Sequence, residues 1–342
     1  MKKIYTSAIG LLLLGALAAC GGAPGSSESE KLILGAYTTP REAYGKLIPL
    51  FQEQWKKETG QEVAFEQSYL GSGAQSRAIV EGFEADIAAL SLEADVERIA
   101  QAGLITHDWK SAPHDGMVST SIVVFGVRKG NPQDIRDWAD LAKPGIEILT
   151  PNPKTSGGAQ WNILALYGAA KRGYVEGVPD DDDAAAMEFL TSVLKNVSVM
   201  DKGARESITN FEKGVGDVII TYENEIRVGQ QAGQDYEMVI PRSTILIENP
   251  VAVIDAYADK HGMRDAAEAF VEFLFTRQAQ EIFAQYGLRS PDPEVAQATA
   301  PQYPPVEDLF TAAEFGGWKE IAAKFFGDDG IYTQAIASVQ GQ

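Results

Sequence analysis

Apolar positions along the chain fall into two alternating patterns. Short, mostly apolar runs are followed by segments whose apolar residues recur at helical spacing, as Tyr44, Leu47 and Phe51 do after the run 32–37. The same alternation predicts strands at 63–65, 85–92, 119–129, 146–149, 197–200, 217–222, 237–241 and 244–255. It predicts helices that begin at Thr38, Ser72 and Gly203 and helices at 96–102, 137–142, 161–171, 184–195, 264–286 and 318–326. Strands that alternate with helices indicate an α/β protein whose sheets are largely parallel and flanked by helices.

The C-terminal third of this pattern carries three further expectations. We expect 264–286 to form one long helix that Gly287 ends, and 291–305 to be irregular because it is rich in proline. The helix at 318–326 is expected to be the last. A chain of 342 residues that is 45% hydrophobic divides naturally into two domains. We expect 31–118 to form the first part of domain 1, 119–243 domain 2, and 244–342 the second part of domain 1.

Three helix starts rich in small residues each follow a predicted strand. They lie at 152–162 (Asn-Pro-Lys-Thr-Ser-Gly-Gly-Ala-Gln-Trp-Asn), at 68–75 and at 201–207. Glycine at such a turn lets main-chain N–H groups approach one point, and the free N–H groups of a helix N-terminus bind anions. Any one of them is also explained as an ordinary capped helix start. Together they indicate an anion site in which three helix N-termini face one cleft.

These segments resemble the periplasmic sulfate- and thiosulfate-binding proteins that serve ABC importers. The resemblance runs from about Leu32 into the C-terminal region, and the string Asn-Pro-Lys-Thr-Ser-Gly-Gly is its most specific part. The motifs that carry it are 37–42 (Tyr-Thr-Thr-Pro-Arg-Glu), 71–73 (Gly-Ser-Gly), 127–132 (Val-Arg-Lys-Gly-Asn-Pro), 152–158, 203–205 (Gly-Ala-Arg), 216–220 (Gly-Asp-Val-Ile-Ile), 223–225 (Glu-Asn-Glu) and 315–318 (Phe-Gly-Gly-Trp).

The resemblance implies a fold, a function and a set of ligand contacts. The fold is the two-domain type II periplasmic-binding-protein fold with the ligand in the cleft, and the function is delivery of sulfate or thiosulfate to an ABC permease by a monomeric receptor. The dianion is held dry by hydrogen-bond donors, without a neutralising cation and without a cofactor. The implied ligand-binding residues are Thr38 (main chain), Ser72 (hydroxyl and main chain), Ser156, Gly157 and Gly158 (main chain), Ala204 (main chain) and Tyr222.

Two of these positions depart from the usual pattern of sulfate binders. Thr38 stands where an aspartate is usual, and a main-chain donor survives that change. Tyr222 stands where a tryptophan is usual, so a phenolic O–H that can also accept replaces an indole N–H. Thiosulfate binders also lack the tryptophan, and phosphate or molybdate is the alternative cargo. A donor-only site rejects phosphate because its proton finds no acceptor. Phosphate would be favoured if Glu42, Glu206 or Glu223 faced the ligand, whereas we expect all three to face solvent or cap helices.

The N-terminus has the pattern of a bacterial lipoprotein signal. Two lysines precede an apolar core at 9–17, and Leu-Ala-Ala-Cys follows at 17–20. We expect 1–19 to be a signal peptide and 20–30 a flexible tether with lipid on Cys20, which anchors the receptor on the periplasmic or extracytoplasmic side of a membrane. A plain signal peptide, with Cys20 as a bystander, is the alternative. Cys20 is the only cysteine in the sequence. If it carries a lipid, no free thiol remains to form a disulfide, bind a metal or act as a nucleophile.

The net charge and the absence of catalytic motifs argue against several classes of function. The formal net charge of −19 argues against nucleic-acid binding, and it is compatible with an anion site that works through local N–H dipoles. The 3 histidines have no metal or triad spacing, no nucleophile elbow or P-loop occurs, and we predict neither an enzyme nor a metal site. The aspartate run 180–183 is interpreted as a solvated helix start and not as a calcium loop. The other hypotheses are an ester hydrolase that uses the anion pocket and a sensor or structural lipoprotein.

Overall fold

The computed structural model describes residues 30–341, so the expected signal peptide, Cys20 and nearly all of the tether lie outside the described residues. The strands are β1 (Glu30–Tyr37), β2 (Val63–Leu70), β3 (Ile87–Ala89), β4 (Met117–Val127), β5 (Ile148–Pro151), β6 (Val197–Asp201), β7 (Val218–Tyr222), β8 (Glu237–Val239), β9 (Ser243–Val253) and β10 (Asp308–Phe310). The α-helices are α1 (Arg41–Thr59), α2 (Ser72–Val80), α3 (Glu93–Gln101), α4 (Gly157–Lys171), α5 (Asp183–Lys195), α6 (Ala204–Glu212), α7 (Glu223–Gln231), α8 (Asp255–His261), α9 (Arg264–Leu274), α10 (Arg277–Gln285), α11 (Pro293–Thr299), α12 (Trp318–Phe326) and α13 (Ile331–Gln340). Short 3₁₀ helices are η1 (Trp109–Ser111), η2 (Pro113–Gly116), η3 (Trp138–Ala142), η4 (Ala300–Gln302) and η5 (Ala312–Phe315).

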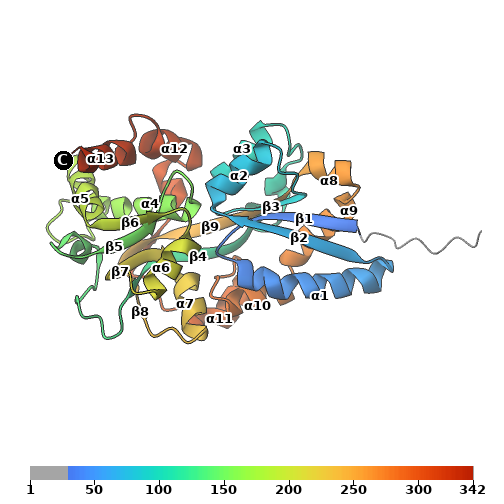
Figure 1. The fold of residues 1–342 in the computed structure, drawn as a ribbon, viewed down its shortest axis with the longest axis horizontal. Coiled ribbons are helices and arrows are strands. Elements are labelled where there is room, and N and C mark those ends of the chain that lie inside the picture. Colours follow the sequence, from blue (N-terminus) through green and yellow to red (C-terminus); the bar gives the residue numbers. More distant parts are fainter. Residues whose placement is uncertain (1–29, 342) are drawn as a thin grey trace, which may run out of the picture.

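The strands form two mainly parallel groups that two long strands connect. The order is β2-β1-β3-β9-β4-β7-β5-β6, with β1 parallel to β2 and β3, and β5 parallel to β6 and β7. The long strands β4 and β9 are antiparallel to each other, β4 is antiparallel to β7, and β9 is antiparallel to β3 and parallel to β10. Each runs from one group into the other: residues 117–122 of β4 pair with β9, and 123–127 pair with β7. Figure 1 shows the two halves side by side along the long axis, with β4 and β9 between them. This is the expected two-domain α/β architecture of type II binding proteins.

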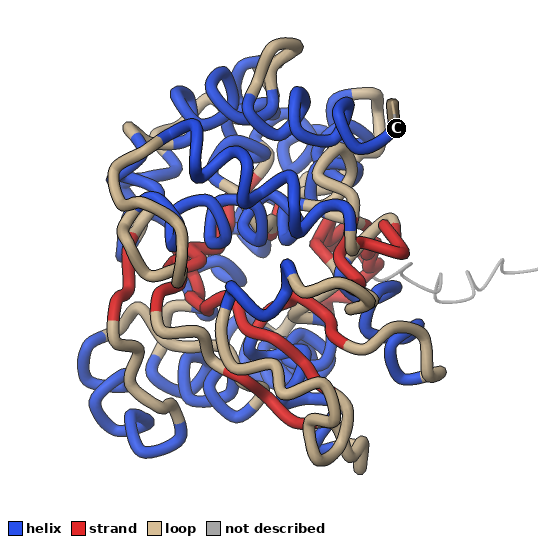
Figure 2. The backbone as a smooth tube through the Cα atoms, turned by 90° about the vertical axis from the view of Figure 1, so that its left-hand side faces the viewer, coloured by secondary structure: helices blue, strands red, loops and turns tan. Residues whose placement is uncertain are grey.

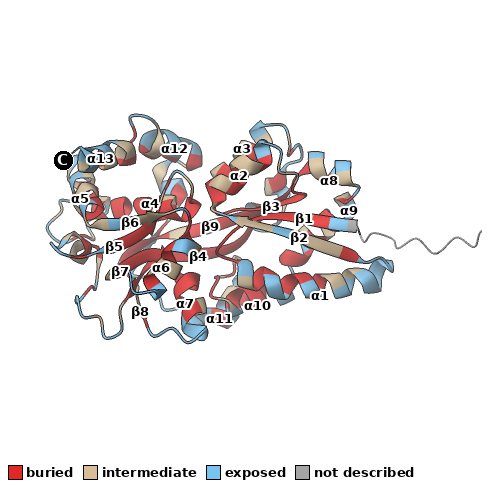
Figure 3. Ribbon diagram, in the orientation of Figure 1, coloured by how far each residue is buried: buried red, intermediate tan, exposed pale blue. Residues whose placement is uncertain are grey.

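Helices cover both faces of each group of strands. The central strands β4, β5 and β7 are buried throughout, whereas β2 and β6 at the two edges are partly exposed (Figure 3), and helices lie on either side of the strands in the view along the long axis (Figure 2). Strand β4 is buried along its whole length, because it lies inside the sheet and is covered on both faces. Within residues 30–341, no helix has the length and hydrophobicity that crossing a bilayer requires.

The C-terminal segment packs on the second half and not on the first. Phe310, Trp318 and Phe325 belong to the same buried cluster as Trp161 and Tyr167 of α4. The ring centroids of Trp161 and Trp318 lie 4.6 Å apart, and those of Tyr167 and Phe325 lie 5.0 Å apart. In Figure 1, α12 and α13 lie beside α4 and α5. The expected assignment of all of 244–342 to the first domain is therefore wrong for 308–340, and the division at 118 and 243 stays a prediction.

Three expected helix boundaries in the same third of the chain also differ. The segment 264–286 forms two helices, α9 and α10, because the hydroxyl of Thr276 accepts a hydrogen bond from Ala279 N (3.3 Å) and starts a new helix. The proline-rich stretch contains α11, whose start is capped by Asp292 with Pro293 in its first turn. The helix α12 is followed by α13, which begins after Gly330.

Candidate functional site

A small cavity lies where the two halves meet, with about 170 Å³ of empty space. It is lined by Tyr37, Thr38, Thr39, Gly71, Ser72, Ser91, Ser156, Gly158, Ala204 and Tyr222. Every site residue predicted from the sequence lines it except Gly157, which lies beside it: a Cβ atom on Gly157 would be 2.7 Å from Ser91 Oγ. The structure thus brings together residues that are more than 180 positions apart in the sequence.

Three helix N-termini point main-chain N–H groups at this cavity, in addition to the main chain of Thr38. Helix α2 begins at Ser72, α4 at Gly157 after its cap Ser156, and α6 at Ala204. The first N–H groups of a helix have no acceptor within that helix, and the aligned peptide dipoles place a partial positive charge there. The cavity is therefore electropositive although no lysine or arginine lines it.

The two serine hydroxyls have different roles from those that the resemblance implied. The Ser72 hydroxyl donates to Asp95 Oδ2 (2.6 Å) and accepts from Ser91 N (2.9 Å), so its proton is already used and its main-chain N–H is the available donor. Ser156 has the opposite arrangement. Its main-chain N–H donates to Asn152 O (2.9 Å), while its hydroxyl oxygen accepts from Ala159 N (3.4 Å) and keeps its own proton free.

A pair of hydroxyls forms another part of the wall. Ser91 Oγ and Tyr222 Oη lie 2.6 Å apart, and either can be the donor. Because one hydrogen bond uses one proton, the pair always keeps a second proton for the cavity. Burial raises the pKa of Tyr222, so the phenol is neutral at physiological pH. The structure therefore keeps a donor at the position where the resemblance implied an indole N–H.

Sequence reasoning missed four residues of the wall: Tyr37, Thr39, Gly71 and Ser91. Tyr37 ends β1, and Ser91 lies two residues after β3. Both could have been found from the rule that ligands bind at the carboxyl ends of parallel strands. The hydroxyl oxygens of Tyr37 and Thr39 are buried and have no hydrogen-bond partner in the described part of the chain.

Gly71 allows the two halves to touch beside the cavity. A Cβ atom at this position would lie 2.6 Å from Thr155 O and 2.9 Å from Lys202 O, which belong to the other half. The main-chain N–H of Ala74 donates to Thr155 O across the same contact (3.2 Å). The backbones can approach this closely only because residue 71 has no side chain.

The charged groups near the cavity form one cluster around Arg205. Arg205, next to Ala204, donates to both carboxylate oxygens of Glu42 (2.8 Å each), and its Nε lies 3.2 Å from Glu225 Oε2. Burial raises the pKa of Glu225, and the nearby Arg205 opposes that shift. Because Glu42 lies on α1 and Glu225 on α7, this cluster also links the two halves.

No carboxylate lines the cavity. Glu42 is engaged by Arg205, and Glu206 lies exposed in the first turn of α6. Glu223 lies in the first turn of α7 and is fully buried in ion pairs with Arg227 and Arg289 (2.7 Å each), so the expectation that it faces solvent is wrong. The condition that would have favoured phosphate is therefore absent from the cavity wall.

Among residues 30–341, no group of three or more His, Cys, Asp or Glu is arranged to hold a metal ion. The aspartate run 180–183 starts a helix as expected: Asp182 Oδ1 accepts from the N–H groups of Ala184 (2.9 Å) and Ala185 (3.0 Å). The cavity wall, with its N–H and O–H groups, supports reversible binding of a small anion by neutral donors.

Comparison with known proteins gives matches along nearly the whole chain. Residues 32–289 match the family described as bacterial extracellular solute-binding protein. The sulfate-binding protein of Synechococcus elongatus is 44% identical over 95% of this chain and 93% of its own length, and that of Escherichia coli is 40% identical over 90% and 93%. The thiosulfate-binding protein of Pseudomonas aeruginosa is 34% identical over 98% of both chains. The solved structure of the sulfate-binding protein SubI of Mycobacterium tuberculosis superposes with a TM-score of 0.79 at 37% identity, covering 86% of this chain and 99% of that chain.

Proposed function

Since the chain belongs to the bacterial extracellular solute-binding proteins, we propose that it is an extracytoplasmic receptor that binds sulfate or thiosulfate and delivers it to an ABC permease. The observation that carries the proposal is the cavity wall, in which helix N-termini and hydroxyls converge and no charged side chain is present. Two groups of relatives that bear the names sulfate-binding and thiosulfate-binding protein support the choice of ligand.

The tetrahedral dianion accepts hydrogen bonds from two kinds of donor in this proposal. Main-chain donors are the N–H groups of Thr38, Ser72, Gly157, Gly158 and Ala204, and hydroxyl donors are Ser156 and the Ser91–Tyr222 pair. Donors that are fixed by the fold do not need to reorganise when the anion enters, so they stabilise its charge without a counter-ion. A ligand that carries its own proton is disfavoured, because the wall has no carboxylate to accept it.

The test is calorimetric titration of the purified full-length receptor in mild detergent with sulfate, thiosulfate, phosphate and molybdate at one pH. We expect sulfate or thiosulfate to bind tightly and phosphate to give no heat. Binding of phosphate in preference to sulfate would contradict the proposed ligand, and silence for all four anions in a folded protein would contradict the proposed function. Delivery is tested by deleting the gene: growth on sulfate as the sole sulfur source should slow and growth on cysteine should not.

We further propose that Cys20 carries the lipid that anchors the receptor and that the receptor acts as a monomer. The Leu-Ala-Ala-Cys sequence at 17–20 supports the lipid. Fractionation of cells that produce the Cys20→Ser protein tests it, because this variant should leave the membrane fraction and the wild type should stay there. Light scattering of the purified receptor tests the monomer.

A further inference from the structure

A second, larger hollow lies next to the anion cavity. It is a groove with about 1010 Å³ of empty space, and it shares Thr38 with the cavity. One wall belongs to the first half, with Thr38, Arg41 and Tyr69, and the other belongs to the second half, including Lys202 and Lys213. Because the groove lies between the two halves, it widens when they move apart.

The groove has unpaired positive charge. Arg41, Lys202 and Lys213 are exposed and make no ion pair with any described residue, and the Arg41 guanidinium lies 4.6 Å from the centre of the Tyr69 ring. Arg205 also lines the groove, but it is paired with two carboxylates, Glu42 and Glu225, and adds no free positive charge.

The acidic residues of the groove, Asp201 and Glu206, offset only part of this charge. The Asp201 carboxylate already accepts hydrogen bonds from Ser207 Oγ (2.8 Å) and Asn210 Nδ2 (2.6 Å). The concentration of unpaired cations here is notable in a chain whose formal net charge is −19.

An anion that approaches the protein therefore meets two different potentials. At physiological salt, charges are screened over about 8 Å, so the acidic surface elsewhere has little influence at the groove. Close to the groove, three cations attract the dianion, and local fields of this kind raise association rates by about 10- to 1,000-fold. Further inside, no cation lines the cavity, and the bound anion is held by N–H and O–H donors.

We propose that Arg41, Lys202 and Lys213 form an outer capture site for the oxyanion, which sets how fast it enters and not how long it stays. The inference rests on the proposed function, since it assumes a dianionic ligand. Capture and retention are separated in space, so the association rate should depend strongly on salt while the dissociation rate should not.

The test is stopped-flow binding of sulfate to the full-length receptor in detergent. Tryptophan fluorescence is a suitable signal because Trp161 Nε1 donates to the main-chain oxygen of the cavity residue Ser91 (3.1 Å). The variant carries Arg41→Gln, Lys202→Gln and Lys213→Gln. The control is Lys57→Gln, an exposed lysine at the far end of α1 that makes no ion pair with the described residues.

At low ionic strength, the triple variant should bind sulfate about 10-fold more slowly, with an unchanged dissociation rate, and about 0.5 M salt should remove the difference. The Lys57→Gln protein should behave as wild type. An unchanged association rate in the triple variant, or a loss of affinity that lies in the dissociation rate, would overturn the proposal. So would slowing only by Arg77→Gln and Lys154→Gln, which change a separate hollow that residues of both halves line. If the wild type binds no sulfate in the calorimeter, the proposed function itself fails, and that outcome is separate from these.

Discussion

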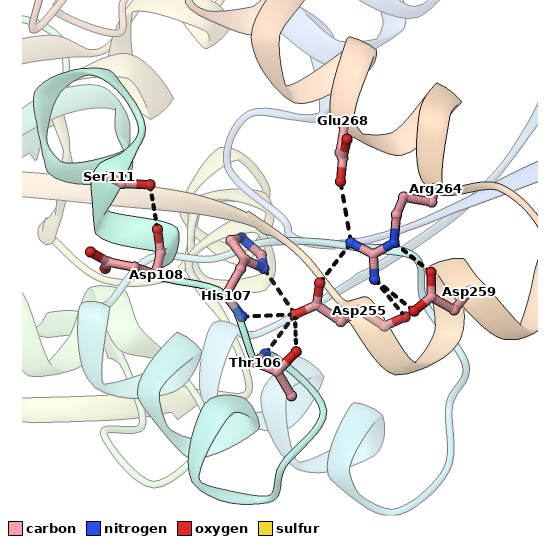
Figure 4. A network of polar contacts seen from close by, with 8 residues as sticks. All are labelled: Thr106, His107, Asp108, Ser111, Asp255, Asp259, Arg264 and Glu268. Carbon is pink, nitrogen blue, oxygen red and sulfur yellow. Dashed lines mark hydrogen bonds and ion pairs between the residues drawn. The ribbon is translucent and has the colours of Figure 1, made fainter.

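Two places in this protein are built to hold negative charge below the surface, and they do so differently. Asp255, at the start of α8, is a permanent anion. One of its carboxylate oxygens, Oδ2, accepts hydrogen bonds from Thr106 N (2.5 Å), His107 N (3.2 Å) and the ring of His107 (2.8 Å), and the other lies 2.8 Å from Arg264 Nη1 (Figure 4). Burial opposes ionisation, but these contacts outweigh it and hold the pKa of Asp255 far below its ordinary range. The cavity between the halves offers similar main-chain and hydroxyl donors but no arginine.

The difference follows from whether the anion ever leaves. The Asp255 carboxylate is covalently attached, so the half-buried Arg264 beside it always has its partner. A cation in the cavity would lose its partner whenever the ligand dissociated, and an unpaired buried charge costs several kcal/mol. Helix N-termini avoid this cost, because their N–H groups carry only partial charges that water can satisfy in the empty state. A site that must be stable both empty and filled is therefore better built from dipoles than from charges.

The largest expected effect comes from preventing the two halves from closing over the cavity. In Gly71→Ala, the new Cβ atom would clash with the main-chain oxygens of Thr155 and Lys202, which cannot move aside as a side chain would. We expect sulfate affinity to fall by at least about 100-fold, or about 2.7 kcal/mol, measured by calorimetry. The control is Gly45→Ala, since a Cβ atom on that exposed helical glycine has no heavy atom within 4 Å. Equal affinities for the two variants would show that binding does not need this contact.

The variant Asp255→Asn replaces the buried carboxylate by a neutral amide of similar size. The neutral amide weakens the hydrogen bonds from Thr106 and His107 and the ion pair with Arg264, so we expect unfolding to become easier by about 2 kcal/mol. Urea unfolding gives the free energy, and calorimetry should show unchanged sulfate affinity. Asp265→Asn on neighbouring α9 is the matched control, because Asp265 is exposed and pairs with no cation in residues 30–341. A loss of affinity in Asp255→Asn would mean that the two places are coupled.

The two serines of the cavity separate ligand contact from structural support. Ser156→Ala removes the free hydroxyl donor, and we expect about a 10-fold weaker sulfate affinity. Ser72→Ala instead removes a partner of Asp95 and of Ser91 N, so it should cost more stability and less affinity than Ser156→Ala. Thermal unfolding and titration of both variants measure the two effects. The reverse order would assign the Ser72 hydroxyl to the ligand.

The sequence predicts those parts of the site that depend on local signals. A glycine-rich helix start after a strand places its own N–H groups, so Gly158 and Ala204 could be found from short motifs, with the resemblance joining them into one site. The use of the Ser72 hydroxyl depends on Asp95, which lies 23 residues further along the chain. Ser91 carries no motif, and only the alignment of strand ends in the folded sheet brings it to Tyr222.

The same distinction explains the outcome for the fold. Strand and helix alternation was confirmed because period-2 and period-3.6 patterns are set by nearby residues. The break between α9 and α10 was missed because the apolar pattern continues across Thr276, whose cap interrupts the helix without changing that pattern. The apolar face of α12 predicted that the helix packs against the core. It did not predict that Trp318 would contact Trp161 of α4, in the second half.

The smallest effect is expected from pH, and it separates ligand binding from the stability of the fold. The cavity wall titrates only through Tyr37 and Tyr222, whose pKa values burial raises, so sulfate affinity should stay constant between about pH 6 and 9.

The free energy of unfolding should not stay constant over this range, because α8 ends at His261, which contacts Asp86 (2.7 Å) and Glu84 (3.1 Å). Burial lowers the pKa of His261, but the two carboxylates outweigh it, and the net shift is upward. A raised histidine pKa gives stability that is fully present below about pH 6.5 and is lost as pH rises through the folded value. Urea unfolding across this range should show the loss in the wild type and a smaller slope in His261→Gln, while calorimetry gives the same sulfate affinity at each pH. A slope in the affinity instead would place a titrating group at the ligand and contradict a site made of dipoles alone.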